Sequence, residues 1–356
     1  MKQNLLKSLE QVDILENRIT NLDVEILAIL LKDRTTNKNI IWATDAYYIA
    51  KNDTKYAPTN PIEIDLITGP DNSTVIKPRI MKSQSEQKKR VREKAEVFTP
   101  SWVCNRQNNL VDGSWFAVDN VFNFESEKTW TANTEKINFT SSNKTWQDYV
   151  LDVRLEICCG EAPYLVSRYD TVDGKILETI NRIGILDRKI RVINENTSSL
   201  DQWLTWVKKA YQSSYGYEWQ GDSLLISREN LLYTFSDYFF ERYGKDPEIE
   251  LLKEISEIIS WNIWQMDGIK CVVPMSCKDV KTKPLATFCD MIDGTIPATV
   301  IEKCSGCVNN NIIKHNGVYC KIRDWKETDD TKNVVRFVDL VVKKNNLDAL
   351  NITNLE

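Results

Sequence analysis

Several features that mark particular classes of protein are scarce or missing in this sequence. Only one of the 356 residues is histidine, and no apolar run approaches the roughly 20 residues that a membrane helix requires. The first residues lead into charged positions without the apolar stretch of a signal peptide. No internal repeat and no low-complexity tract occurs. We therefore expect a cytoplasmic protein without membrane segments.

Charge and cysteine content argue against two further classes. The formal net charge of −5 does not suit a protein that holds DNA over its whole surface, because phosphate binding depends on clustered Lys and Arg. The densest basic run covers residues 88–94, and a solvated helix face or a linker is its ordinary interpretation. The nine cysteines do not make a disulfide scaffold in a chain of this length. In a cytosolic protein, closely spaced cysteines more often bind a metal.

Hydrophobic periodicity predicts three regions along the chain. Residues 1–85 are predicted to form an α+β accessory segment, with amphipathic helices between residues 5 and 32 and a short strand at 40–42. Residues 86–295 alternate strands with helices, which is typical of an α/β domain with a mainly parallel sheet. Residues 296–356 combine a cysteine-rich element with a C-terminal strand region.

Within the central region, the pattern is specific enough to place several elements. A buried strand is predicted at residues 151–158. The short apolar segments at 183–186 and 190–193 could each be a strand or part of a helix. Apolar residues at helical spacing predict helices at 200–212, 223–243 and 249–264.

Three residues of the central region occupy places where α/β proteins bind nucleotides, at the carboxyl ends of strands. Gly160 follows the first strong strand, and a glycine there lets the backbone approach a ligand. Glu218 stands where a carboxylate can accept hydrogen bonds from two ribose hydroxyls. Asp267 stands where a carboxylate can accept a hydrogen bond from an adenine amino group. Taken singly, each has an ordinary interpretation as a tight turn, a surface carboxylate or a helix-ending turn.

Four short motifs, taken together and in order, resemble those of gamma-class adenine-specific DNA methyltransferases. That class includes modification subunits of restriction-modification systems. Residues 96–100, Glu-Val-Phe-Thr-Pro, resemble its Phe-Thr-Pro motif. Its Leu-Asp-Pro-x-Cys-Gly-x-Gly-x-Phe-Leu motif is matched at residues 155–156, 159–160 and 164–165. Its Gly-x-Glu run into Ala-x-x-Asn-Leu-Leu is similar to residues 216–232, and its Asn-Ile-x-x-x-Asp motif is similar to the run that ends at Asp267.

The resemblance covers roughly residues 95–270 and implies a Rossmann-like, class I S-adenosylmethionine-dependent methyltransferase domain. It implies that the methionine end of the cofactor would be bordered by Phe98, Thr99 and Pro100. The amino-acid portion of the cofactor and the turn beside it would involve Glu156, Cys159 and Gly160. The ribose would be bound by Glu218 and the adenine by Asp267.

The sequence also departs from the family pattern. Ile157 replaces a proline, Ala162 replaces the second glycine, and a long insertion precedes Glu218. No Pro-Pro pair occurs, so the Asp/Asn-Pro-Pro-Tyr/Phe segment with which the family holds its target adenine is missing, and the chain ends about where that segment would begin. We therefore expect the S-adenosylmethionine-binding subunit of a site-specific adenine DNA methyltransferase. It would act on DNA only with a partner subunit that carries the segment and recognises the target.

Two other functions remain open. The chain could be a catalytically inactive, methyltransferase-like scaffold or regulatory subunit, in which case no cofactor binding is expected. A restriction nuclease is a poorer alternative, because Asp339 and Lys343 do not make a convincing acidic-pair-and-lysine metal site.

The spacing Cys-x2-Cys-x7-His-x4-Cys near the C-terminus predicts a zinc site. The predicted ligands are Cys304, Cys307, His315 and Cys320. Three thiolates and one imidazole complete a tetrahedral zinc site, and because all four ligands are protein groups the zinc would be structural. The only histidine of the chain falls in this window. One ligand, most plausibly His315, could be replaced by Cys271, Cys277 or Cys289.

Overall fold

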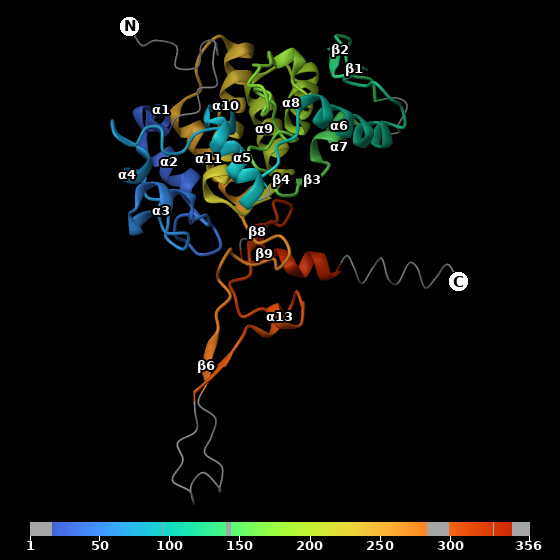
Figure 1. The fold of residues 1–356 in the computed structure, drawn as a ribbon. Coiled ribbons are helices and arrows are strands. Elements are labelled where there is room, and N and C mark those ends of the chain that lie inside the picture. The colour runs from blue at the N-terminus through green and yellow to red at the C-terminus, as the bar shows by residue number, and fades with distance from the viewer. Residues whose placement is uncertain (1–15, 95, 140–143, 283–298, 330, 344–356) are drawn as a thin grey trace, which may run out of the picture. The chain divides into compact units, whose positions relative to one another are not determined.

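The computed structural model describes residues 16–94, 96–139, 144–282, 299–329 and 331–343. The chain forms two compact units, which divide between Trp264 and Gln265. Each unit mixes helices with short strands (Figure 1). None of the helices in the described ranges is both long and apolar enough to cross a membrane.

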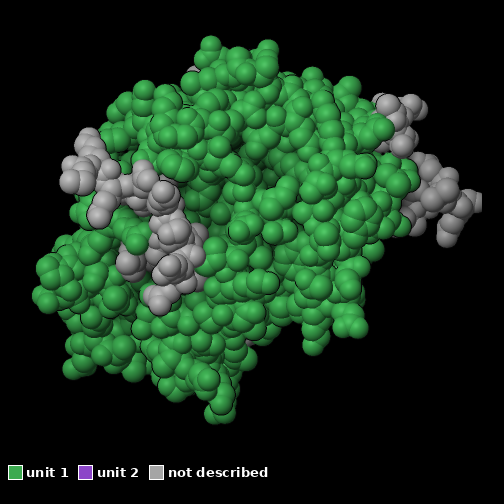
Figure 2. Space-filling view, turned by 90° about the horizontal axis from the view of Figure 1, so that it is seen from above, with its two compact units in different colours: residues 1–264 green, residues 265–356 purple. Residues whose placement is uncertain are grey.

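The first unit, shown in green in Figure 2, is mostly helical. Its α-helices are α1 (Glu16–Leu22), α2 (Val24–Leu31), α3 (Ala46–Lys51), α4 (Ile64–Ile67), α5 (Gln84–Lys94), α6 (Ser101–Phe116), α7 (Trp146–Leu151), α8 (Ile185–Asn196), α9 (Leu200–Gln212), α10 (Gly221–Tyr243) and α11 (Ile249–Asn262). Its 3-10 helices are η1 (Thr54–Tyr56), η2 (Arg79–Met81) and η4 (Thr179–Asn181).

Two small sheets accompany these helices. The strands are β1 (Asn123–Ser126), β2 (Thr129–Ala132), β3 (Arg154–Glu156), β4 (Ser214–Glu218) and β5 (Ile263–Gln265). The first two form an antiparallel hairpin. The other three form a sheet in the order β3-β4-β5, in which β3 and β4 run parallel and pair Arg154 with Ser214. Parallel strands end at the same edge of their sheet, so residues that follow β3 and β4 lie close together.

The sequence accounts for the helices that cover this sheet. The side chain of Ser199 accepts a hydrogen bond from the Gln202 N–H and caps the start of α9, whose buried face carries Trp203, Val207 and Tyr211. Helix α10 is buried along most of its length and ends at Gly244, which adopts a φ of +66°. The prediction of a helix at 200–212 is confirmed, and the helix predicted at 223–243 begins two residues earlier than expected.

Residues 1–85 do not form a separate domain in the part of the chain that the structure describes. The buried guanidinium of Arg228 on α10 donates hydrogen bonds to the carbonyls of Leu30 and Lys32. The Gly221 N–H donates to the carbonyl of Trp42 at 3.1 Å, and a Cβ on Gly221 would lie 2.1 Å from the Ile41 oxygen. These contacts join the described part of the N-terminal segment to α10, and both belong to the first unit. The predicted boundary at 295/296 lies outside the described residues.

Some predicted elements differ in the structure. The strand expected at 40–42 is only an isolated bridge between Ile41 and Pro61. The ambiguous segments at 183–193 belong largely to α8, and the strand predicted at 151–158 is limited to β3. The helix expected to reach residue 264 ends at Asn262, where β5 begins.

The second unit contains two antiparallel hairpins and little helix. Its elements are β6 (Val280–Thr282), β7 (Val300–Glu302), α13 (Ser305–Val308), β8 (Lys321–Arg323) and β9 (Val334–Arg336). In the predicted C-terminal strand region, β8 and β9 are strands, whereas residues 337–343 are helical. A helix here leaves the carboxylate of Asp339 one turn from Arg336, with which it forms an ion pair at 2.7 Å.

Candidate functional site

The turn that follows β3 lies against the end of β4. The Cys159 N–H donates a hydrogen bond to the Tyr217 carbonyl at 2.9 Å, and the Gly160 N–H donates to Oε2 of Glu218 at 2.9 Å. Gly160 has a φ of +55°, a left-handed conformation that glycine adopts without the cost of a Cβ. Of the three residues that the sequence places at the carboxyl ends of strands, the structure thus brings Gly160 and Glu218 into contact.

The Glu218 carboxylate is almost fully buried and largely occupied by backbone donors. Its other oxygen, Oε1, accepts from the N–H groups of Trp219 and Gln220 at 2.8 and 3.1 Å. Burial raises the pKa of Glu218, while these N–H bonds and the one from Gly160 act in the opposite direction. A carboxylate has about four acceptor positions, so one position on Oε2 is left for a further donor such as a hydroxyl.

Glu156 is the last residue of β3, and Cys159 belongs to the turn that follows. The Glu156 carboxylate accepts from the N–H groups of Tyr164 and Leu165 at 3.3 and 3.0 Å, and burial raises its pKa to about 8. The Cys159 sulfur is buried, and a Cβ on Gly216 would approach it to 3.3 Å. In this structure Glu156 therefore holds the turn in place, and Gly216 leaves room for Cys159.

The Phe-Thr-Pro segment lies beside this turn. A Cβ on Gly160 would lie 3.7 Å from Cε1 of Phe98, whose ring also lies 5.2 Å from the Arg79 guanidinium. The Thr99 carbonyl accepts a hydrogen bond from the Thr171 hydroxyl at 3.2 Å, and Pro100 directly precedes α6. The structure thus brings Phe98, Gly160 and Glu218 into one neighbourhood.

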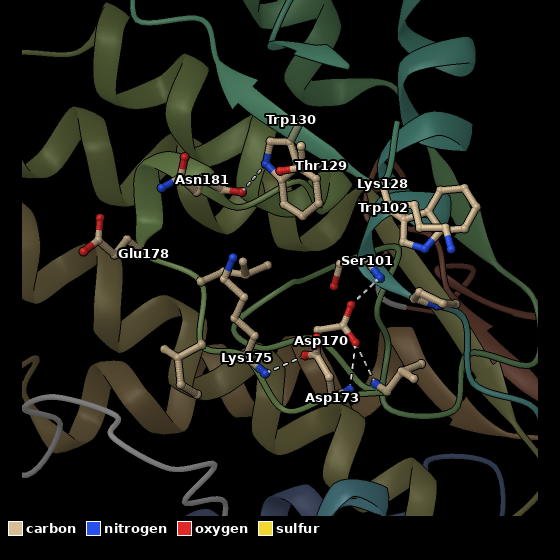
Figure 3. Close-up of a pocket in the computed structure, with 14 residues that line it drawn as sticks. Ser101, Trp102, Lys128, Thr129, Trp130, Asp170, Asp173, Lys175, Glu178 and Asn181 are labelled. Carbon is tan, nitrogen blue, oxygen red and sulfur yellow. Dashed lines mark hydrogen bonds between the residues drawn. The ribbon is translucent and has the colours of Figure 1, made fainter. Parts of the chain in front are cut away.

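A cavity of about 650 Å³ opens at the start of α6 (Figure 3). Its wall includes Trp102, Trp130 and Lys175. The Asp170 carboxylate accepts the Ser101 N–H at 2.7 Å and so ties this cavity to α6. Sequence reasoning missed these residues, because α6, β2 and the loop at 170–175 are far apart in the sequence and no local pattern shows that they meet. Indole faces beside lysine and carboxylate groups suit a flat, polar ligand.

Asp267 belongs to the second unit and closes a local turn there. Its carboxylate accepts from the N–H groups of Ile269 and Lys270 at 3.1 and 3.2 Å, and it forms an ion pair with the Lys270 ammonium at 3.2 Å. This agrees with the ordinary interpretation of an Asp-Gly turn. A role for Asp267 toward adenine remains a prediction.

A second candidate site, in the second unit, consists of three cysteines and the histidine. Its members are Cys277, Cys304, Cys307 and His315, whose ligand atoms all lie within 4.8 Å of one another. The three sulfurs lie 3.6 to 3.7 Å from Nδ1 of His315. With Zn–S near 2.3 Å and Zn–N near 2.05 Å, a tetrahedral site has S–N separations of about 3.6 Å. The cluster could therefore hold a metal ion such as zinc.

The turns around the cluster fit this role. A Cβ on Gly306 would lie 2.6 Å from both the backbone nitrogen and Nδ1 of His315, so only glycine allows this approach. The Asn316 N–H donates to the Cys304 sulfur at 3.3 Å. Although burial opposes ionisation, the N–H groups of Asn316 and Cys307 lower the pKa of Cys304 to about 6. A thiolate is the form that binds a metal.

The predicted fourth ligand, Cys320, is not part of the cluster. Its side chain is fully buried, its sulfur donates to the Gln265 carbonyl at 3.3 Å, and its N–H donates to the Cys271 carbonyl at 3.0 Å. Cys277 takes its place, whereas the sequence offered Cys277 as one of three possible substitutes and most plausibly for His315. Cys289 lies outside the described residues.

Comparisons of the chain with protein-family models, with curated proteins and with solved structures found no match.

Proposed function

We propose that the first unit is a Rossmann-like methyltransferase domain that binds S-adenosylmethionine, and that the chain serves an adenine-specific DNA methyltransferase of a restriction-modification system. The observation that carries the proposal is the hydrogen bond from the Gly160 N–H to Glu218, formed where two adjacent parallel strands end. Nucleotide-like ligands bind at this edge of α/β sheets. Phe98 also lies beside Gly160. This supports the proposal, because the resemblance places both residues next to the same cofactor.

Each residue has a stated role in this proposal. The remaining acceptor position of Glu218 would take a ribose hydroxyl, and Gly160 would let the backbone approach the ligand. Glu156 and Cys159 would shape the turn next to the amino-acid portion. The methionine end would be bordered by Phe98, Thr99 and Pro100. The bound cofactor would supply an activated methyl group.

Transfer to adenine needs groups that hold an extruded base, and the 356 residues contain no Asp/Asn-Pro-Pro-aromatic segment. In the proposal a partner subunit supplies this segment and the recognition of the DNA target. The cysteine and histidine cluster would bind a structural zinc ion. Incubation of the purified chain with DNA and radiolabelled S-adenosylmethionine should give no methylated DNA, and efficient methylation by the chain alone would contradict the need for a partner.

Calorimetric titration with S-adenosylhomocysteine tests the binding role. Wild-type protein should bind one equivalent, and Glu218→Gln should weaken binding about tenfold or more, since it removes a charge-assisted acceptor. Glu250→Gln is the matched control, because the Glu250 side chain is 83% exposed and lies on α11. Circular dichroism would verify that both variants fold. Absence of binding by wild-type protein would favour the inactive scaffold.

A further inference from the structure

A buried cluster of charged side chains lies next to the Phe98 segment. Arg90 on α5 donates from Nη2 to Oδ2 of Asp222 at 2.7 Å and from Nε to Glu96. The Lys82 ammonium lies 3.4 Å from the same Asp222 oxygen, to which the Tyr47 hydroxyl also donates at 2.7 Å. The four charged side chains are between 0% and 9% exposed, so the pairs are shielded from water.

The members of this cluster come from the segments that form the candidate methyl-donor site. Glu96 stands two residues before Phe98, and Asp222 stands four residues after Glu218. The Arg90 guanidinium also donates to Oε1 of Gln220 at 3.1 Å. Arg90 is therefore bonded both to the Phe-Thr-Pro segment and to the segment that follows β4.

The charges of this cluster favour a role in positioning the 96–100 segment more than a role in stabilising the fold. Burial alone would raise the pKa of Asp222, but the charges of Arg90 and Lys82 hold it below its usual range. Within the described part of the chain, Oδ1 of Asp222 and Oε1 of Glu96 have no hydrogen-bond partner. Buried pairs with incomplete bonding add little net stability. The hydrogen bonds of Arg90 connect the two segments directly, which restricts how the segments can move relative to each other.

We propose that Arg90 is a positioning residue for the methyl-donor site: through Glu96 and Asp222 it holds the 96–100 segment against the Gly160 turn. We call this connection from Arg90 through Glu96 and Asp222 the clamp. The ligand's identity in this inference rests on the proposed function, whereas the clamp is a property of the protein alone. Arg90 acts through Phe98, since Phe98 is the side chain of this segment that lies beside Gly160.

Hydrogen exchange measured without ligand tests the clamp. In Arg90→Gln, backbone amides of residues 96–104 should exchange roughly tenfold faster than in wild type, because the segment opens more often. Arg106→Gln is the matched control, since Arg106 is 53% exposed and pairs with Glu125 on the surface. Arg90→Lys keeps the charge and should restore most of the protection, which provides a second variant if Arg90→Gln does not fold. Unchanged exchange in a folded Arg90→Gln protein would overturn the proposal.

Titration with S-adenosylhomocysteine tests the consequence for binding. Arg90→Gln should weaken binding about tenfold in the wild-type background and have no further effect in a Phe98→Ala background. A general loss of stability would weaken binding in both backgrounds and would count against positioning. If wild-type protein does not bind at all, the proposed function fails, while the exchange data still decide the clamp.

Discussion

The metal cluster contains Cys277 where the sequence spacing predicted Cys320. Two alanine variants can distinguish these two assignments of the fourth ligand. Cys277→Ala removes a sulfur that lies 3.7 Å from Nδ1 of His315. Cys320→Ala removes a buried sulfur that the structure places outside the cluster. The sequence spacing predicts that Cys320→Ala weakens zinc binding, and the structure predicts that Cys277→Ala does so.

The size of the effect follows from the ligand count. Structural zinc sites of small domains have apparent binding free energies of about 10–16 kcal/mol, so one of four ligands accounts for roughly 3 kcal/mol, or about a hundredfold in affinity. Cys277→Ala should therefore bind zinc about a hundredfold more weakly. Cys320→Ala should keep the wild-type affinity and lose only about 1 kcal/mol of stability for the lost packing.

Competition against a chromophoric chelator measures both affinities, and elemental analysis gives the zinc content of the purified proteins. Wild type and Cys320→Ala should each contain about one equivalent, as expected for a four-ligand site. Zinc binding by Cys277→Ala at wild-type affinity, or its loss in Cys320→Ala, would refute the assignment of ligands. A zinc content of wild-type protein below half an equivalent would refute the site itself.

Two further predictions concern stability. Burial raises the pKa of Glu16 to about 8, and burial together with the charge of Glu16 raises that of Glu229. The folded protein then keeps protons that the unfolded chain releases above the ordinary pKa of 4.5, so the free energy of unfolding falls as the pH rises toward 8. Glu229→Gln should raise the melting temperature at pH 8 and change it little at pH 5; an equal shift at both pH values would contradict this sign. Gly221→Ala should cost about 1–3 kcal/mol in urea unfolding, since its Cβ would meet the Ile41 carbonyl. At Gly244 a Cβ would have free space, but φ is +66°, so Gly244→Ala should cost about 1–2 kcal/mol from backbone strain alone. A larger loss of stability in Gly244→Ala than in Gly221→Ala would contradict the predicted clash between a Cβ at Gly221 and the Ile41 carbonyl.

Local patterns predicted those helices whose signals lie within their own sequence. Helix α9 carries a capping serine and a buried stripe at helical spacing, and both are visible without tertiary information. The apolar run at residues 40–42 led to a wrong prediction of a strand, because Trp42 is buried by contacts with residues that are distant in the sequence. Its N–H donates to Asn60 and its carbonyl accepts from Gly221. A short apolar run cannot distinguish these environments.

The candidate sites also differ in how far their residues could be predicted from the sequence. Gly160 and Glu218 were predictable because the ends of neighbouring parallel strands must meet. Cys277 was harder to predict, because the hairpin formed by β6 and β7 separates it from Cys304 along the chain. Spacing favoured Cys320, but that residue's backbone pairs with Cys271, and its side chain is directed into the protein interior instead.

Few apolar side chains are buried in the described part of the second unit. Among its described residues, the buried apolar ones are Met266, Cys271, Val272, Val273, Cys304, Cys320, Ile322 and Val338. Cys277 precedes β6 and Cys304 follows β7, so an ion in the cluster would join the two ends of that hairpin. For this unit, folding and metal uptake would then be a single thermodynamic event. The concentration of free zinc would then determine whether the second unit is folded. The first unit has a larger apolar core, and its folding would not depend on zinc.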